Sequence, residues 1–290
     1  GVASIGLDIV FSEPEEPPEM QPLREAREEM EDLSGDVTPA LRLVDEAIER
    51  ASTDAQLEAA IRAARDRVTL GYFFRTERDA ELDGGSEIDL ERDLPNVRRS
   101  KLKVKTRVVR EDEADVLTCV DVEPNIERFH RAPRRMGFFS TYTDIDGVVR
   151  RASLVIRCGG ELYVSLDLAI AELALDTQAE AIGFVESEAP GIEWIRLGDR
   201  MIPTAKGGQI LVNYLGPTRT FPHLPIVDIL AGRYDDELRD RGAVVIVGPT
   251  EVGIQDVYGS PFSAAYPGVE VHATIVDNLL TGKVLRRTAD

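Results

Sequence analysis

The sequence lacks most of the features that mark a known chemistry. It has two cysteines and three histidines in 290 residues, and the histidines (His130, His223 and His272) do not have the spacing of a metal site. No G-x-S-x-G motif offers a serine nucleophile, and no G-x-G-x-x-G motif follows a strand-like run to form a dinucleotide site. The sequence therefore predicts no catalytic residue, no metal site and no cofactor.

Positive charge and long apolar runs are scarce as well. The chain has 53 acidic residues against 34 basic ones, which gives a net charge of −19. Nucleic acids and anionic lipid surfaces bind to concentrated lysine and arginine, so neither is expected to be the main partner. No stretch of the sequence approaches the ~20 apolar residues that a membrane-spanning helix needs.

Three short motifs suggest a chemistry that their surroundings do not support. The segment GPTEVG at 248–253 follows an apolar run, but isoleucine and glutamine come next, where a phosphate loop needs lysine and serine or threonine. The segment DIDG at 144–147 is followed by two arginines and not by calcium ligands, so we interpret it as a turn. Cys119 and Cys158 lie in apolar runs, where buried thiols are the commoner outcome and are expected, although the even count permits one disulfide.

Hydrophobic residues make up 43% of the chain, enough for a sizeable core. We predict a single α/β domain with a mostly parallel central β-sheet flanked by helices, plus a β-hairpin region. Near-continuous apolar runs at 2–11, 68–74 and 243–247 predict its innermost strands. Apolar periodicity and end signals predict helices, and turn residues between apolar runs predict paired strands. The helices are expected at 23–33, from 38 onwards, and at 53–67, 125–134, 163–175, 225–231, 235–239 and 268–280; the strand pairs are 103–109 with 116–122, 136–142 with 148–158, and 192–197 with 201–203.

Several segments, in order, resemble one family of receptor modules. They are IGLDIVFSEP at 5–14, TDIDGVVRR at 143–151, YVSLDLA at 163–169, ILVNYLGP at 210–217 and GVEVHA at 268–273. Together they resemble the second type of CHASE domain, a cyclase- and histidine-kinase-associated sensory extracellular domain. The resemblance covers 1–287, with 75–123 as a variable insertion and 288–290 as a tail leading to a missing membrane segment.

The resemblance implies an extracytoplasmic (periplasmic or extracellular) sensory domain of a bacterial plasma-membrane receptor. Membrane helices would flank it, and a cytoplasmic adenylate or guanylate cyclase, histidine kinase or Ser/Thr kinase would read out a small-molecule or environmental signal, with pairing into a homodimer through the full-length receptor. No catalytic residues carry over. The alternative is a soluble, carboxylate-dependent α/β hydrolase, in which Asp8, Glu13, Asp144 and Asp146 would converge, or a periplasmic small-molecule binding protein.

Any ligand is expected outside the carboxyl ends of the parallel strands, where open α/β sheets form their crevice. Asp8, within the first strand at 2–11, and the loop 248–256 are the segments best placed to line it. Asn213 and His272 are weaker additions. A lone histidine in an apolar helix is usually a core residue, so a core role and a signal-coupling role for His272 both stay open. The candidate ligand-binding residues are thus Asp8, Asn213, Thr250, Glu251, Asp256 and His272.

Overall fold

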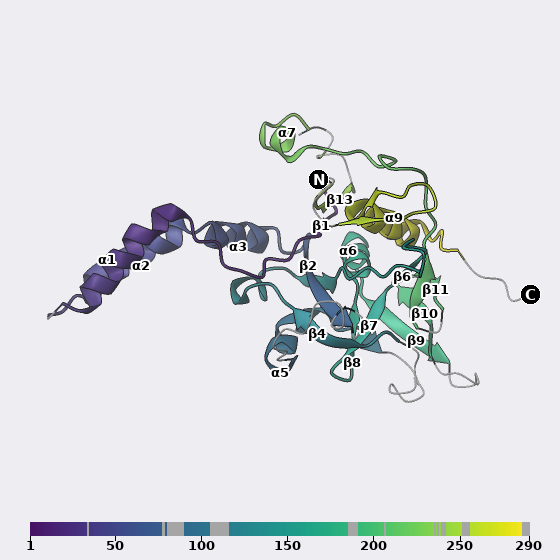
Figure 1. Ribbon diagram of the computed structural model, residues 1–290, viewed down its shortest axis with the longest axis horizontal. Coiled ribbons are helices and arrows are strands. Elements are labelled where there is room, and N and C mark those ends of the chain that lie inside the picture. Colours follow the sequence, from purple (N-terminus) through teal and green to yellow (C-terminus); the bar gives the residue numbers. More distant parts are fainter. Residues whose placement is uncertain are drawn as a thin grey trace, which may run out of the picture.

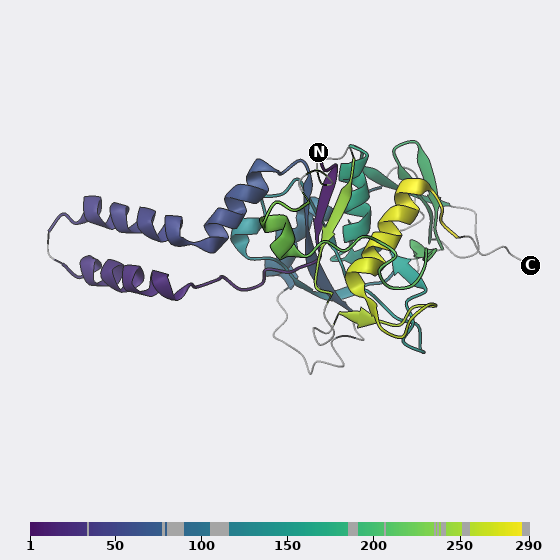
Figure 2. The same cartoon turned by 90° about the horizontal axis from the view of Figure 1, so that it is seen from above.

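A computed structural model of the chain has a central body from which a long helical arm projects (Figures 1 and 2). The structure describes residues 1–33, 35–76, 79, 90–104, 116–184, 191–205, 207–234, 236, 238, 242–250 and 256–285. Two predicted features, the helix at 235–239 and Glu251, fall wholly or mainly outside these residues.

The centre of the body is a five-stranded mixed sheet in the order β13 (Val244–Val247), β1 (Ser4–Leu7), β2 (Val68–Thr76), β4 (Cys119–Glu123), with β5 (Arg135–Phe138) also pairing along β2. Strands β13, β1, β2 and β5 are parallel, and β4 is antiparallel to β2. The predicted α/β class with a mostly parallel central sheet is therefore confirmed.

Two helices cover one face of this sheet. Helix α6 (Leu166–Ala174) begins at Ser165, whose Oγ accepts a hydrogen bond from the Leu168 N–H at 3.2 Å. All residues of α6 from Leu166 to Leu173 are buried, Asp167 and Glu172 included. Helix α9 (Gly268–Thr281) packs beside it and ends at Gly282, which adopts φ +73°, a left-handed conformation that suits glycine.

Most of the smaller sheets pack on the far side of α6 and α9 and enclose the largest apolar core, whereas the hairpin at 155–164 also contributes to the core on the other face of the central sheet. The pairing of β10 with β11 confirms the strand pair predicted at 192–203. The strands are β3 (Lys103–Val104), β6 (Arg151–Ser153), β7 (Val155–Cys158), β8 (Glu161–Val164), β9 (Ala179–Phe184), β10 (Gly191–Leu197), β11 (Arg200–Pro203), β12 (Gln209–Leu211), β14 (Val257–Tyr258) and β15 (Tyr266–Pro267), and the short helices are α5 (Leu90–Asp93) and α7 (Ile226–Leu230).

The arm consists of two antiparallel helices that extend away from the body (Figure 2). They are α1 (Gln21–Glu31) and α2 (Thr38–Ala51), and α3 (Thr53–Ala63) leads from them back to β2. Neither α1 nor α2 contains a buried residue. The prediction of three helices between the first two strands is correct. The local sequence pattern did not reveal that two of these helices, α1 and α2, extend away from the body.

The prediction that residues 243–247 form an innermost strand is wrong. Strand β13 lies at the edge of the central sheet, and within the described residues β1 is its only strand partner. Val244 and Ile246 pack toward α6 and α9, yet all four residues of β13 are only half-buried. An unbroken apolar run therefore did not distinguish an edge strand with one covered face from a central strand.

Three other local predictions are corrected. The turn at Asp144–Gly147 forms, with the Gly147 N–H donating to the Asp144 carbonyl at 2.9 Å, but the expected hairpin does not. Instead β5 pairs with β2, and β6 pairs with β12. Strands β3 and β4 pair with β9 and β2 and not with each other. Within 125–134 the helix is a single 3-10 turn, Glu127–Phe129.

The expectation of two free thiols is also wrong. Cys119 of β4 and Cys158 of β7 form a disulfide, with Cα atoms 5.1 Å apart. Their apolar runs belong to different sheets that pack against each other, and both residues belong to the core on the face of the central sheet opposite α6. Burial and bridging thus occur together at this pair.

Candidate functional site

Three elements bring a histidine and two carboxylates together in the interior. Asp8 directly follows β1, and its N–H donates to the Val247 carbonyl at 2.8 Å. Asp167 lies in the first turn of α6, where the helix dipole stabilises an anion. His272 lies in the second turn of α9. The exposed fractions of Asp8, Asp167 and His272 are only 8%, 3% and 4%.

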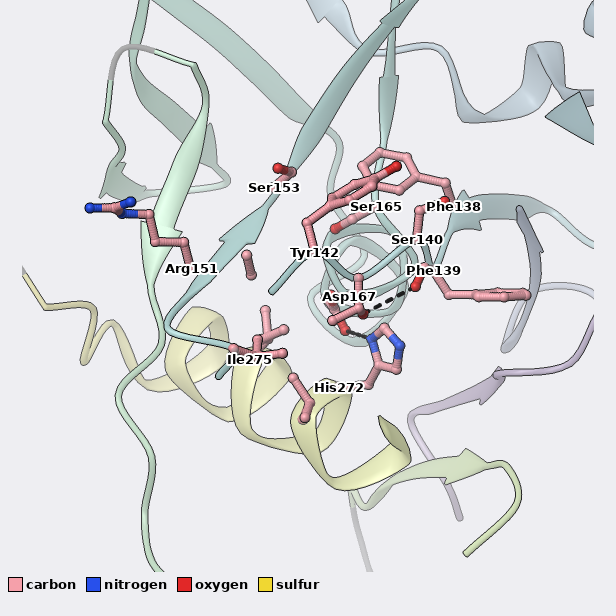
Figure 3. A pocket seen from close by; sticks show the side chains of 14 residues that line it. Phe138, Phe139, Ser140, Tyr142, Arg151, Ser153, Ser165, Asp167, His272 and Ile275 are labelled. Carbon is pink, nitrogen blue, oxygen red and sulfur yellow. Dashed lines mark hydrogen bonds and ion pairs between the residues drawn. The ribbon is translucent and has the colours of Figure 1, made fainter. Parts of the chain in front are cut away.

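The imidazole of His272 lies between the two carboxylates. Its Nδ1 is 2.7 Å from Oδ1 of Asp167, a hydrogen bond that is drawn in Figure 3. Its Nε2 is 3.6 Å from Oδ1 of Asp8, close enough for an ion pair but too long for a good hydrogen bond. The N-terminal strand, the central helix and the last helix are therefore joined by one charged side chain.

A third carboxylate, that of Asp256, completes the cluster. The Asp256 carbonyl accepts from the Gly268 N–H at 3.0 Å, and the Asp256 carboxylate lies against Gly268 so closely that a Cβ at this position would overlap it. Among the described residues, Oδ2 of Asp8 and Oδ2 of Asp256 have no hydrogen-bond partner although both atoms are buried. Unsatisfied buried carboxylate oxygens are costly, and such groups concentrate at functional sites.

The cluster shifts the pKa values of its members in consistent directions. Burial raises the pKa of Asp8 to about 6; the charges of Asp256 and Asp167 add to the rise, and the charge of His272 opposes it. Burial likewise raises the pKa of Asp256. Burial by itself lowers the pKa of His272, but Asp167, Asp8 and Asp256 together raise it to about 10. At neutral pH the cluster thus holds one imidazolium among three carboxyl groups.

A small cavity adjoins Asp167 and His272 (Figure 3). Its wall also includes Ser140, Ser165 and Ile275. The space is enough for about one water molecule. A molecule of the size of water in this space would contact the His272–Asp167 pair.

The remaining sequence candidates do not join this cluster. Asn213 ties the strand β12 region to the end of α9, because its N–H donates to Oδ1 of Asn278 at 2.8 Å. Thr250 is exposed, and Glu251 lies outside the described residues. Whether any of the candidates binds a ligand stays a prediction.

The carboxylates of the hydrolase alternative do not converge either. Arg150 holds Asp144 and Asp146 at 3.0 and 2.8 Å on the exposed turn, and Glu13 is exposed. Only Asp8 of that set lies in the buried cluster.

Four buried acidic residues were not among the sequence candidates: Asp121, Asp167, Glu172 and Glu270. Asp167 belongs to the cluster, and its signal was an acid in the first turn of a largely apolar helix. Glu270 accepts from the Arg219 N–H at 3.0 and 2.9 Å and pairs with Nε2 of His223 at 3.1 Å. Glu270 thereby fixes the 217–223 loop, which explains His223, a residue for which the sequence offered no partner.

Comparisons with known proteins place the chain in one family. A profile of the CHASE2 domain matches residues 1–290. No curated protein and no solved structure matches the chain. In the part of the chain that the structure describes, no group of histidine, cysteine and acidic side chains could hold a metal ion, and no helix combines the length and apolar character needed to cross a membrane. The chain therefore belongs to the CHASE2 family of extracellular sensory domains.

Proposed function

We propose that this chain is the extracytoplasmic sensory part of a bacterial plasma-membrane receptor and is not itself an enzyme. A cytoplasmic nucleotide cyclase, histidine kinase or Ser/Thr kinase would receive its signal. Family membership supports the sensory role. The Cys119–Cys158 disulfide supports an oxidising compartment, because such bonds persist mainly outside the cytoplasm.

The contact of His272 with Asp8 and Asp167 carries the proposal for how the domain signals. Asp8 ends the first strand and His272 lies on the last helix, so the cluster connects these two elements of the fold directly. A stimulus that changes the charge of the cluster, or that supplies donors to its unsatisfied oxygens, would alter the position of α9 relative to β1. A ligand can shift such an equilibrium only through its different affinity for the two positions.

The test compares variants of the full-length receptor in membranes. Asp8→Asn and His272→Gln each change the charge of the cluster, and Glu270→Gln is the matched control, because Glu270 is equally buried on α9 but lies outside it. We measure effector activity per folded receptor across pH 5 to 8. The two cluster variants should change the pH or stimulus response several-fold more than the control. Equal responses in all three variants would contradict the proposal.

A further inference from the structure

The α1–α2 arm is the least covered part of the molecule. Its helices pack against each other and project from the body on the side away from the visible end of α9 (Figures 1 and 2). The apolar residues along the seam, such as Leu23, Met30, Leu41 and Val44, remain only half-buried. Helices of 11 and 14 residues are marginal alone, since most helical stability in proteins comes from packing an amphipathic face. The arm therefore has an apolar surface without a covering layer.

The two sides of the arm differ. One side is closed by ion pairs: Nε of Arg27 lies 2.6 Å from Asp45 across the helices, and Arg27 also pairs with Glu31 at 2.8 Å. Leu43 is two residues from Asp45 on α2, and so points nearly the opposite way on a helix with about 100° per residue. Leu43 is 60% exposed.

Leu43 belongs to an apolar stripe that we call the Leu43 face, made of Ala40, Leu43 and Ala47. These residues are spaced i, i+3 and i+7, so they line one side of α2. The alanines are small, which allows another helix to approach closely. Leu33, at the turn between the two helices, is also 60% exposed.

We propose that the Leu43 face is a self-association surface, on which the arm of a second copy of this chain packs to form a four-helix bundle. A pairing about a two-fold axis along the arms places α1 of each copy over α2 of the other. If the arms of the two copies instead pointed in opposite directions, α1 of one copy would lie over α1 of the other.

Charge favours the first arrangement. Helix α1 presents glutamates, among them Glu28 and Glu29, to solvent. On α2, Arg50 has 76% of its side chain exposed and lies seven residues after Leu43, so it is on the same side of the helix. On α1, Glu29 is two residues after Arg27 and so lies on the side away from the Arg27–Asp45 pair. Packing α1 over the α2 of the second copy brings Glu29 toward Arg50, whereas packing α1 over α1 would oppose glutamate with glutamate.

The size of the surface predicts a weak contact. A 14-residue helix is about 21 Å long, and a helix pair is about 20 Å wide. The footprint is thus about 400 Å² per copy, and the total stays below the roughly 1,200 Å² of stable complexes. Weak pairing of this kind responds readily to orientation or local concentration.

Sedimentation of the 290-residue chain tests the pairing directly. We expect a reversible dimer at concentrations on the order of 100 μM. Leu43→Glu should raise the dissociation constant of the dimer tenfold or more, so that the chain becomes mainly monomeric. The matched control is Leu230→Glu on α7, where an 81% exposed leucine receives the same change. It should leave the dimer intact. A monomer at every concentration, or a dimer that only Leu230→Glu weakens, would overturn the proposal.

A charge exchange tests the arrangement of the helices. One variant carries Arg50→Glu, and a second carries Glu29→Arg. Each variant alone should dimerise less than the wild type, and an equimolar mixture should restore dimers, because each α1 then meets an α2 of opposite charge. Both positions are exposed, and the Arg50–Glu46 contact that is lost is a weak surface pair, so far-ultraviolet circular dichroism and melting temperature should change little. Failure of the mixture to restore the dimer would refute the paired-arm geometry.

Discussion

Replacing Asp8 with asparagine should stabilise the fold at neutral pH, although it removes a charged member of the buried cluster. The Asp8 carboxylate is almost inaccessible to water, and its Oδ2 has no hydrogen-bond partner among the described residues. The attraction of His272 does not offset the cost of burial, because the pKa of Asp8 is still raised to about 6. The ionised carboxylate therefore destabilises the native state at pH 7.

The magnitude follows from the raised pKa. A rise from 3.8 to about 6 corresponds to roughly 3 kcal/mol, at about 1.4 kcal/mol for each tenfold change in proton affinity. Asparagine removes the charge but places an amide near the imidazolium of His272, which returns part of this gain. We therefore expect Asp8→Asn to raise the free energy of unfolding by about 1 to 3 kcal/mol at pH 7.

The sign of the pH dependence is a second check on the same variant. Because the folded-state pKa of Asp8 is raised, its contribution to stability is fully present below about pH 4 and is lost as the pH rises through 6. The gain in the free energy of unfolding from Asp8→Asn should thus be near zero at pH 4 and should increase between pH 4 and 6.

Urea unfolding at pH 4, 5, 6 and 7 measures this advantage. Asp146→Asn is the control, since Arg150 lowers the pKa of that exposed carboxyl to about 2, and removal of the charge there should give no gain in stability at pH 7. A loss of more than about 1 kcal/mol for Asp8→Asn at pH 7, or a gain that is largest at pH 4, would show that burial does not dominate the energetics of Asp8.

Three further predictions concern stability. His272→Ala should lower the free energy of unfolding by about 3 to 5 kcal/mol at pH 7, since it leaves buried carboxylates without their cation; urea titration should show a much smaller loss for His130→Ala, whose ring faces a backbone carbonyl. Because the pKa of His272 is raised from 6.5 to about 10, its stabilising contribution is fully present below pH 6.5 and should disappear as the pH rises through 10. Replacing Cys119 and Cys158 together by serine should cost up to about 4 kcal/mol, because the bond closes a loop of 39 residues, and a variant as stable as the oxidised protein in thermal melting would contradict this. Gly137→Ala should cost about 3 kcal/mol or more, because its Cβ would lie 2.5 to 2.6 Å from backbone atoms at the start of α6; an unchanged melting temperature would show that α6 can move away.

Local signals were sufficient for several elements. Apolar runs located β1 and β2, and Gly282 marked the end of α9 at the expected place. The first strand of the fold and its closing helix could be predicted because hydrophobic periodicity and end signals act within a few residues.

The candidate site was predictable only in part. Asp8 and Asp256 were proposed from the rule that open sheets place their crevice at the carboxyl ends of the strands, and His272 was a weaker addition. Asp167 was missed, and Asn213 was included although it serves to fix the chain near the end of α9. A rule about strand ends says nothing about a residue on a covering helix.

The sequence by itself thus determined the fold class, most of its strands and helices, and the family to which the chain belongs. Only the tertiary structure decided that β13 lies at an edge, that β5 pairs with β2, and that Cys119 meets Cys158. It also brought His272 to Asp167, 105 residues earlier in the chain. The physical reason is that periodicity reflects which face of a segment is buried, whereas the identity of the neighbour depends on competition among all segments that could bury the same face.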